Sequence, residues 1–360
     1  MVVVAPDHRD GSSPVSFINT LEDKETIRKI EYKRIPHKAS TEVYEARDAQ
    51  LRVRLWELGL IHDALLKIDN MVTLKNVAVD RKRAENQNLL AMFARMLDIH
   101  EPGSISFAGH SFGAATTVQF VKSIFYRDSR IQGYKPLYMP AEDSDIVRQI
   151  TPSTPVMLLD LWTLPIQSSA TSWLRSKPMP CYESPEGGSN LLSICSEAFF
   201  KWSSNLNETK RIISKPTDSR SKYPQQPGPH IFYPTASAHL SQSDFGVLFP
   251  WITTKVFGAK EPERVLRLNT RAMLQVMRNA GTEVAITSLV DMELQDVAGL
   301  EKGVPQDEKI LSNVGDSVRG WISLSTEVEE VGLVEKGPAD AMVEGEVLGQ
   351  VVSNEERSMS

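Results

Sequence analysis

The sequence predicts an α/β fold in which helices flank a mainly parallel sheet. Two observations support this. Short apolar runs typical of buried strands alternate with longer segments whose apolar residues recur at helical spacing, and stretches rich in glycine or proline separate them. The chain has 360 residues, of which 41% are hydrophobic and 24% charged, an ordinary composition for a globular protein. This length suits one large domain or two of usual size.

The individual elements follow from the period of the apolar residues. Strands are predicted at 2–5, 104–108, 156–159, 191–195 and 230–234. Helices are predicted at 40–70, 82–97, 114–125, 196–205 and 260–280. Residues 25–35 alternate partly and are expected to form an edge strand or one arm of a hairpin. The polar, turn-rich stretches 126–154 and 214–229 are interpreted as insertions.

Charge divides the chain into two regions. Residues 282–360 hold 17 acidic and 5 basic side chains, a net charge of −12, which leaves +6 on residues 1–281. We expect residues 1–281 to form the folded domain and residues 282–360 an acidic, largely disordered tail. Within that tail only Ile310–Leu311 and Trp321–Leu324 are apolar enough to pack. The net positive charge of residues 1–281 suits either a solvated surface or an approach to anionic lipid. The basic side chains are scattered and do not predict nucleic-acid binding.

The cysteines and the apolar runs limit the class of protein further. The two cysteines, Cys181 and Cys195, are too few for a disulfide framework and have no partner at zinc-ligand spacing. No run reaches the ~18 apolar residues of a membrane span, and no signal peptide is recognisable. We therefore expect a cytoplasmic protein, and the sequence does not define its oligomeric state.

The sharpest local pattern is Gly109-His110-Ser111-Phe112-Gly113, a match to G-x-S-x-G between a predicted strand and a predicted helix. In that setting the serine occupies a strained turn that exposes its hydroxyl. Glycine is expected two positions to either side, because larger side chains would collide with neighbouring backbone. Ser111 is the candidate nucleophile, and the N–H of Phe112 is the candidate oxyanion donor. An incidental glycine turn is the alternative.

A nucleophilic serine needs a general base, and the order along the chain in such sites is serine, acid, histidine. Only His230 and His239 follow Ser111. His230 begins the strand at 230–234, whereas His239 lies in the loop after it, where a catalytic histidine is expected. His239 is therefore the candidate base, and a surface or capping histidine is the alternative.

Asp160 is the candidate acid. It follows the apolar run 156–159, and a carboxylate at the tip of a buried strand is costly without a partner. It would accept a hydrogen bond from the histidine ring and fix its tautomer. A capping or turn aspartate is the alternative interpretation.

Several segments resemble the plasma and type II intracellular platelet-activating factor acetylhydrolases, in the same order over roughly residues 2–281. They are His8-Arg9-Asp10, GHSFGAAT at 109–116, Leu159–Trp162 with Pro165, SEAFF at 196–200 and SAHLSQSDF at 237–245. The resemblance implies an α/β-hydrolase fold and a calcium-independent esterase that cleaves acetyl or short or oxidised sn-2 acyl groups from phospholipids. It also implies a triad of Ser111, Asp160 and His239, a phospholipid partner at a membrane or lipid surface, and no metal or organic cofactor.

The sequence departs from the family pattern near its start. The family has a further strand and an H-G-x-G loop before the strand that leads into H-R-D, and that loop supplies a second oxyanion donor. We expect this N-terminal part to be missing, since residues 2–5 are themselves predicted to be the strand before His8. Ala114 stands where glycine is usual, and the H-R-D segment is interpreted as structural.

Two other functions stay open. A catalytically impaired or inactive relative that binds lipid or a protein partner would fit the missing oxyanion loop. An α/β-hydrolase acting on another small ester or a lactone would fit the same three residues.

Overall fold

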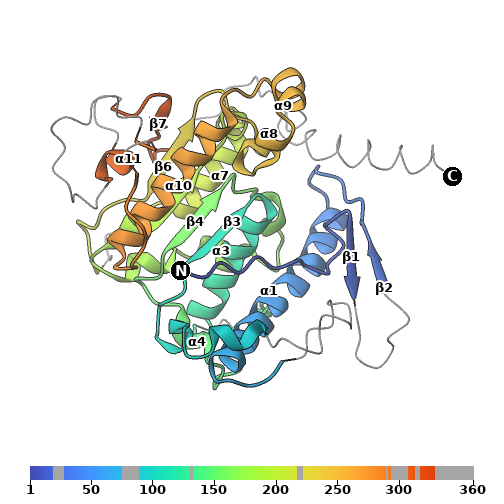
Figure 1. Cartoon of the computed structure of the whole chain (residues 1–360). Coiled ribbons are helices and arrows are strands. Elements are labelled where there is room, and N and C mark those ends of the chain that lie inside the picture. The colour runs from blue at the N-terminus through green and yellow to red at the C-terminus, as the bar shows by residue number, and fades with distance from the viewer. Residues whose placement is uncertain are drawn as a thin grey trace. The chain divides into compact units, whose positions relative to one another are not determined.

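The computed structural model describes residues 1–18, 28–74, 89–129, 133–216, 222–288, 291–292, 307–312 and 317–328 (Figure 1). The chain divides into two compact units. Unit 1 comprises residues 1–105, 118–151 and 164–175, and unit 2 comprises residues 106–117, 152–163 and 176–360. Unit 2 holds the parallel sheet, and unit 1 holds the longest described helix.

Unit 2 is built on a five-stranded sheet of order β3-β4-β5-β6-β7. The strands are β3 (Phe107–His110), β4 (Val156–Leu159), β5 (Leu191–Ile194), β6 (His230–Pro234) and β7 (Trp321–Ser323). The first four pair in parallel, and β7 joins β6 in antiparallel orientation. Parallel neighbours need crossover connections, and here these contain helices. The prediction of a mainly parallel sheet flanked by helices is confirmed.

The strand predictions differ in accuracy. β4 and β6 have the predicted ends, and β5 is one residue shorter than predicted. β3 is displaced towards the C-terminus from the predicted 104–108, because it is aligned by its pairing with β4, in which Phe107 lies opposite Val156. Pairing with a neighbour, rather than the local apolar run, sets the ends of a strand.

The helices of unit 2 lie between and after the strands. They are α6 (Glu197–Phe200), α7 (Ser203–Ile213), α8 (Phe245–Leu248), α9 (Pro250–Phe257), α10 (Pro262–Asn279) and α11 (Glu308–Ser312), with the 3-10 turns η4 (Pro180–Glu183), η5 (Gly187–Asn190) and η6 (His239–Gln242). Helix α3 (Phe112–Phe125) begins in this unit. The helix predicted at 196–205 is two helices, because the non-helical ψ of 81° at Trp202 interrupts it.

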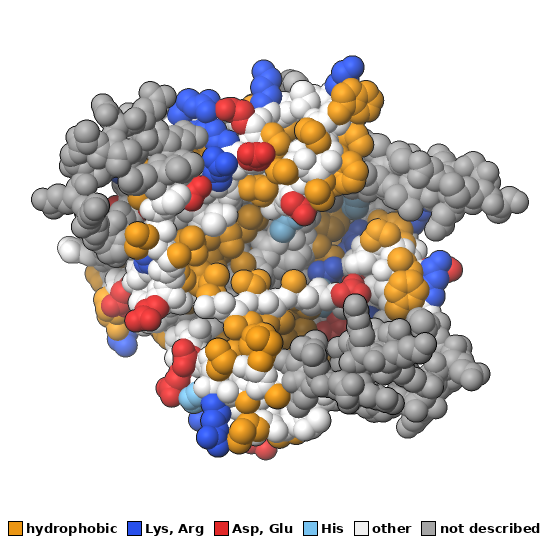
Figure 2. Space-filling view, viewed as in Figure 1, with side chains coloured by type: hydrophobic (Ala, Val, Ile, Leu, Met, Phe, Trp, Pro, Cys, Tyr) orange, Lys and Arg blue, Asp and Glu red, His pale blue; other side chains and the backbone are white. Residues whose placement is uncertain are grey.

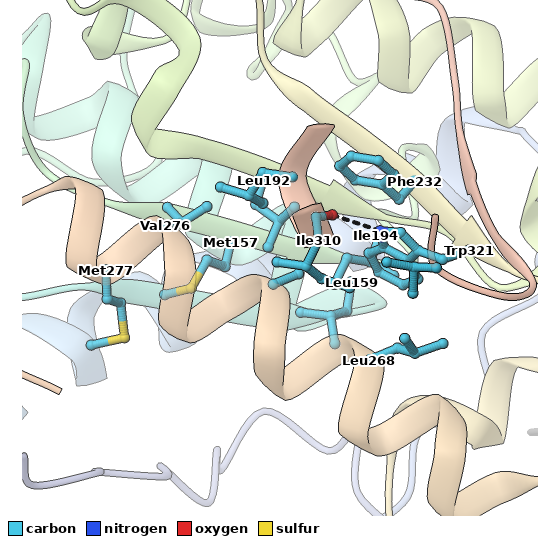
Figure 3. Packing of buried hydrophobic residues seen from close by; sticks show 13 residues of the cluster. Met157, Leu159, Leu192, Ile194, Phe232, Leu268, Val276, Met277, Ile310 and Trp321 are labelled. Atoms are coloured by element: carbon cyan, nitrogen blue, oxygen red, sulfur yellow. Dashed lines mark hydrogen bonds between the residues drawn. The ribbon is translucent and has the colours of Figure 1, made fainter. Parts of the chain in front are cut away.

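The core of unit 2 lies between the sheet and α10 (Figure 3). Its cluster of buried residues comprises Met157, Leu159, Leu192, Ile194, Phe232, Leu268, Ala272, Val276, Met277, Ile310, Leu311, Val318 and Trp321. Residues two apart on a strand share a face, as do residues four apart on a helix. The apolar residues at strand spacing in the sheet and those at helical spacing in α10 therefore face each other in one buried layer.

Two segments beyond residue 281 complete this core. Trp321 in β7 is fully buried, stacks on Phe232 with ring centroids 5.0 Å apart, and donates its indole N–H to the carbonyl of Ile310 at 2.8 Å. Just before α11, Asp307 forms a buried ion pair with Arg271 at 2.7 Å. The region expected to be a disordered tail thus contains packed segments, while residues 329–360 lie outside the described residues.

Unit 1 is organised by α1 (Thr41–Asp69), a helix of 29 residues. Ser40 caps it by accepting a hydrogen bond from the N–H of Val43 at 3.2 Å. β1 (Val15–Ile18) and β2 (Arg28–Glu31) form an antiparallel pair, which confirms the hairpin arm expected within 25–35. The shorter elements are α4 (Ile146–Gln149), α5 (Ser172–Ser176) and the 3-10 turns η1 (Leu89–Phe93), η2 (Asp98–His100) and η3 (Leu164–Ile166).

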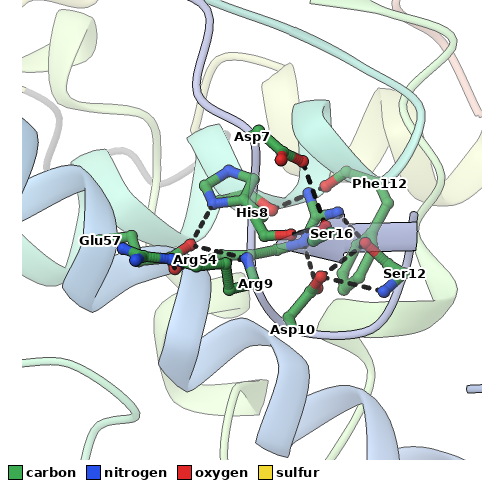
Figure 4. Close-up of polar contacts among 10 residues, drawn as sticks. Asp7, His8, Arg9, Asp10, Ser12, Ser16, Arg54, Glu57 and Phe112 are labelled. Atoms are coloured by element: carbon green, nitrogen blue, oxygen red, sulfur yellow. Dashed lines mark hydrogen bonds and ion pairs between the residues drawn. The ribbon is translucent and has the colours of Figure 1, made fainter. Parts of the chain in front are cut away.

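The H-R-D segment is tied to α1 by charged hydrogen bonds (Figure 4). Nδ1 of His8 and Nε of Arg9 contact the Glu57 carboxylate at 2.8 and 3.1 Å. The carboxylate of Asp10 accepts from Nε of Arg54 at 2.6 Å. Burial opposes the charge on Asp10, yet the Arg54 guanidinium holds the pKa of this carboxyl below its usual value. These contacts support the structural role expected for the segment.

Two predicted elements are wrong. Residues 2–5 are not a strand: Val2, Val3 and Val4 are 47%, 77% and 47% exposed, and within the described residues no strand pairs with them. β-Branched residues favour a strand only where a neighbour supplies hydrogen bonds. Of the helix predicted at 82–97, residues 82–88 lie outside the described residues. The remainder holds only the 3-10 turn η1, and Arg95 has a φ of +60° that no α-helix allows.

Helix α1 has the length of a membrane span but carries charged side chains along its course. None of the helices within the described ranges combines sufficient length with sufficient apolar character to cross a bilayer.

Trp321→Ala is expected to lower the free energy of unfolding by about 3–5 kcal/mol, because it removes a stacked ring from a closed core. Urea denaturation measures this loss. Trp251→Ala is the matched control, since Trp251 is 67% exposed and its loss should change stability by no more than about 0.5 kcal/mol. Equal effects of the two changes would contradict the packing of β7.

Acid should destabilise the fold through His62 on α1. This side chain is buried, and burial lowers its pKa below 6.5. The unfolded chain then binds the proton more readily, so the free energy of unfolding falls as the pH drops below about 6.5. His62→Leu should reduce this slope by up to about 1.4 kcal/mol per pH unit, measured by urea denaturation from neutral pH downward. The exposed His100→Leu serves as control, and an unchanged slope in His62→Leu would refute the expectation.

Candidate active site

The candidate catalytic residues lie at the carboxyl edge of the sheet in unit 2. Ser111 follows β3, Asp160 follows β4, and His239 lies beyond β6. The register of the four parallel strands aligns His110, Leu159, Ile194 and Phe232. Residues that follow these positions therefore meet at one edge, the usual place for sites in such sheets.

Ser111 occupies a strained turn between β3 and α3. Its φ is +55°, a value uncommon for residues other than glycine. Its N–H donates to the carbonyl of Leu159 at 2.9 Å, and its carbonyl accepts from the N–H groups of Ala114 and Ala115 in the first turn of α3. Such a turn is the backbone geometry that the G-x-S-x-G motif predicts.

The two glycines of the motif have different roles. A Cβ atom on Gly109 would lie 2.3 Å from the carbonyl oxygen of Gly113, so the strand and the helix can approach only without a side chain there. A Cβ atom on Gly113 would meet nothing within 4 Å. The collision expected at both positions is confirmed at Gly109 and wrong at Gly113.

Asp160 is fully buried at the end of β4. Its Oδ2 accepts a hydrogen bond from Nδ1 of His239 at 2.8 Å, and its Oδ1 accepts from the backbone N–H of Ser196 at 2.5 Å. Both oxygens of the buried carboxylate therefore have a donor, as a buried charge requires. The predicted acid and the predicted base are in direct contact.

The loop that carries His239 is fixed by the start of α6. Oε2 of Glu197 accepts from the N–H of Ala236 at 2.5 Å, and the Oγ of Ser237 accepts from the N–H of Glu197 at 2.9 Å. Ala236 has a φ of +55°, a strained value that these bonds help to hold. Glu197 therefore positions the backbone three residues before the candidate base.

The ring of His239 is also held from one face. It is only 8% exposed and stacks on Phe199, with ring centroids 4.7 Å apart and an interplanar angle of 14°. Ser196 caps α6 by accepting from the N–H of Phe199 at 3.3 Å. One short segment, 196–199, thus supports the carboxylate and the imidazole together.

A second histidine lies beside the first. Nε2 of His110 is 3.3 Å from Nδ1 of His239, and the two ring centroids are 4.4 Å apart. Burial, with a smaller effect of the neighbouring imidazole, lowers the pKa of His110 to about 3. His110 is therefore uncharged at neutral pH.

Ser111, the candidate nucleophile, directly follows His110 in the chain. Within the described residues no hydrogen bond joins Oγ of Ser111 to the ring of His239. Because Nδ1 of His239 is engaged by Asp160, Nε2 is the ring atom available to the serine. Catalytic hydrogen bonds are often long in the absence of substrate.

Phe112, the candidate oxyanion donor, is the first residue of α3 and directly follows Ser111. The Phe112 ring is buried and meets Trp162 edge to face, with centroids 5.9 Å apart. Leu161 and Leu164 are also buried.

Four residues of the site had no predicted role: His110, Ser196, Glu197 and Phe199. His110 is part of the motif, but nothing in the sequence shows that its ring meets that of His239. The other three lie in the SEAFF segment, whose resemblance to the family was the only available signal.

Comparison with known proteins agrees with the resemblance. A sequence model of the family described as "Platelet-activating factor acetylhydrolase, isoform II" matches residues 1–287. A protein of Schizosaccharomyces pombe (strain 972 / ATCC 24843) with the name "Putative phospholipase A2" is 24% identical over 293 residues, which are 79% of this chain and 62% of that protein. The chain thus spans less than two thirds of that relative's length. The match and the five-stranded sheet confirm the predicted α/β-hydrolase fold.

Gly109→Ala is expected to destabilise the fold by at least about 1–3 kcal/mol, because the new methyl group overlaps rigid backbone. Gly113→Ala is the matched change at the other glycine of the motif, and it should be neutral or stabilising by up to about 1 kcal/mol. Urea denaturation of both variants tests the difference. If Gly109→Ala were as stable as Gly113→Ala, the close approach of β3 and α3 would be wrong.

Proposed function

This chain belongs to the platelet-activating factor acetylhydrolase isoform II family, and from this premise we propose that it is a serine esterase that hydrolyses phospholipids at a short sn-2 acyl ester. The acyl group is an acetyl group or another short or oxidised chain. The observation that carries the proposal is the 2.8 Å hydrogen bond between His239 and the buried Asp160, beside the strained Ser111. Ser111 is the nucleophile, His239 the base and Asp160 the acid.

In the first step, Nε2 of His239 takes the proton of Ser111 as its Oγ attacks the ester carbonyl carbon. Asp160 holds Nδ1–H of the ring and stabilises the imidazolium that forms. When the tetrahedral intermediate collapses, the bond to the leaving oxygen breaks. His239 gives its proton to that oxygen, and a lysophospholipid alcohol departs from the acyl-enzyme.

In the second step, His239 removes a proton from water, which attacks the acyl group on Ser111. Collapse of this intermediate breaks the bond to the serine oxygen, which regains its proton from His239 and releases the carboxylic acid. Both steps use these side chains, backbone N–H donors and water. The buried carboxylate of Asp160 stabilises the imidazolium form of His239 during both steps.

The oxyanion of each intermediate needs donors in place before it forms. The N–H of Phe112, directly after Ser111 at the start of α3, is the donor that we propose. The positive φ of Ser111 lets its side chain and the following N–H face the same carbonyl group.

A lipid surface is the proposed place of the reaction. Five exposed apolar residues on and between α8 and α9 form what we call the α8–α9 surface: Val247, Leu248, Phe249, Trp251 and Val256, with exposures of 40% to 67%. Hydrophobic side chains gather over these helices near the top of the view in Figure 2. Nζ of Lys255 lies 5.3 Å from the centre of the Trp251 ring. Aromatic rings beside a cationic side chain suit the boundary between acyl chains and phosphate head groups.

Ser111→Ala should abolish hydrolysis of a short-acyl phospholipid, and Asp160→Asn should reduce it by about 10⁴-fold, because each removes one member of a cooperating group. The decisive measurement is covalent labelling by a fluorophosphonate probe, expected at Ser111 in the unaltered chain and absent in Ser111→Ala. An unlabelled native chain would favour an inactive relative that binds lipid. Faster turnover of a simple soluble ester than of the phospholipid would favour another substrate.

Trp251→Ala should weaken association with phosphatidylcholine vesicles by about tenfold, since burying roughly 60 Å² of apolar surface is worth this factor. Sedimentation of the protein with vesicles measures the affinity. Trp56→Ala is the matched control, because Trp56 is 57% exposed on α1, outside the α8–α9 surface. A similar loss in both variants would point to a general apolar effect and against this surface.

A further inference from the structure

The second histidine completes a cluster of metal-binding atoms around the candidate base. His110, Asp160 and His239 each offer one metal-binding atom, and these atoms lie within 4.8 Å of one another. Nε2 of His110 is 3.3 Å from Nδ1 of His239, which is 2.8 Å from Oδ2 of Asp160. Ligands at about 2.0–2.2 Å from a tetrahedral zinc ion lie about 3.3 Å from each other. A small widening of this cluster therefore makes room for such an ion.

The three ligand atoms come from separate, well-held parts of unit 2. His110 ends β3, Asp160 follows β4, and His239 begins η6. Asp160 is anchored through its other oxygen by the N–H of Ser196, and the ring of His239 rests on Phe199. Such supporting contacts orient the ligands of known metal sites.

The geometry of the two rings suits this use, because Nε2 of His110 faces Nδ1 of His239 at 3.3 Å. The proton on Nδ1 of His239 lies towards Asp160, so an Nε2–H group on His110 would face another N–H group. His110 therefore carries its proton on Nδ1 and directs the lone pair of Nε2 towards the cluster.

We propose that His110, Asp160 and His239 form an inhibitory site for Zn²⁺. The ion accepts lone pairs from Nε2 of His110, Nδ1 of His239 and a carboxylate oxygen of Asp160, and water takes the fourth position. The proton displaced from Nδ1 of His239 passes to solvent. Two imidazoles and one carboxylate suit Zn²⁺, whereas Mg²⁺ and Ca²⁺ prefer sites made of oxygen atoms.

Zinc at this position would stop the proposed reaction. With Nδ1 of His239 bound to the metal, the hydrogen bond to Asp160 is lost and the positive ion opposes the formation of an imidazolium. The ring then no longer serves as a base for Ser111. This effect on catalysis rests on the proposed function, whereas binding of the ion does not.

Zinc binding is tested first, on the full chain, by competition with a chromophoric zinc indicator. We expect one tight site per chain, weakened in His110→Phe by at least the roughly 10–100-fold that loss of a supporting residue costs. His100→Phe, at an exposed histidine, should bind as the native chain does. Undiminished binding in His110→Phe, or an equal loss in His100→Phe, would overturn the proposal.

A spectroscopic measurement covers the case in which His110→Phe fails to fold. X-ray absorption at the zinc edge of the native complex should show two imidazole nitrogens among about four ligands. A spectrum with no imidazole, or with one, would place the ion elsewhere and refute the site.

Activity supplies the last measurement. Hydrolysis by the native chain should fall as buffered free Zn²⁺ rises, return on addition of a chelator, and be unaffected by Mg²⁺ or Ca²⁺. Activity that persists when the site is saturated would refute inhibition. A chain without any esterase activity would instead refute the proposed function, while the binding measurements would still decide the zinc site.

Discussion

The site depends on one constraint, the in-register parallel pairing of β3 to β6. This pairing aligns His110, Leu159 and Ile194 at one edge of the sheet. Ser111, Asp160 and Ser196, which lie one or two positions further on, are then brought to the same edge without any long-range adjustment of loops. A shift of one residue in any of these strands would turn its functional side chain to the opposite face.

The buried carboxylate of Asp160 places a second requirement on the site, because its negative charge needs hydrogen-bond donors. A charge without exposure is tolerated only when its oxygens are satisfied. Here one oxygen is bound by the backbone of Ser196 and the other by His239. Because Asp160 is buried away from water, its carboxylate stays hydrogen-bonded to Nδ1 of His239. The other ring nitrogen, Nε2, is not used in this bond.

Much of this arrangement could be predicted from the sequence. The apolar runs at 156–159 and 230–234 became strands with the predicted ends, because pairing on both sides fixes a buried strand. The run 2–5 was mistaken for a strand, because its composition is right and its partner is absent from the described residues. The contact between His110 and His239 could not be predicted, since it depends on the rotation of two side chains across neighbouring loops. The roles of Ser111 as nucleophile, Asp160 as acid and His239 as base stay predictions.

The antiparallel strand β7 has a consequence for how the protein is made. The outer edge of β6 has no strand beside it until residues 321–323 are synthesised, and the core lacks Trp321 until then. From the synthesis of β6 until that point, a nascent chain on the ribosome would thus display an apolar, unpaired sheet edge, a state prone to aggregation. Chaperone demand during synthesis should therefore be set by the arrival of this late segment, although the chemistry is encoded more than eighty residues earlier.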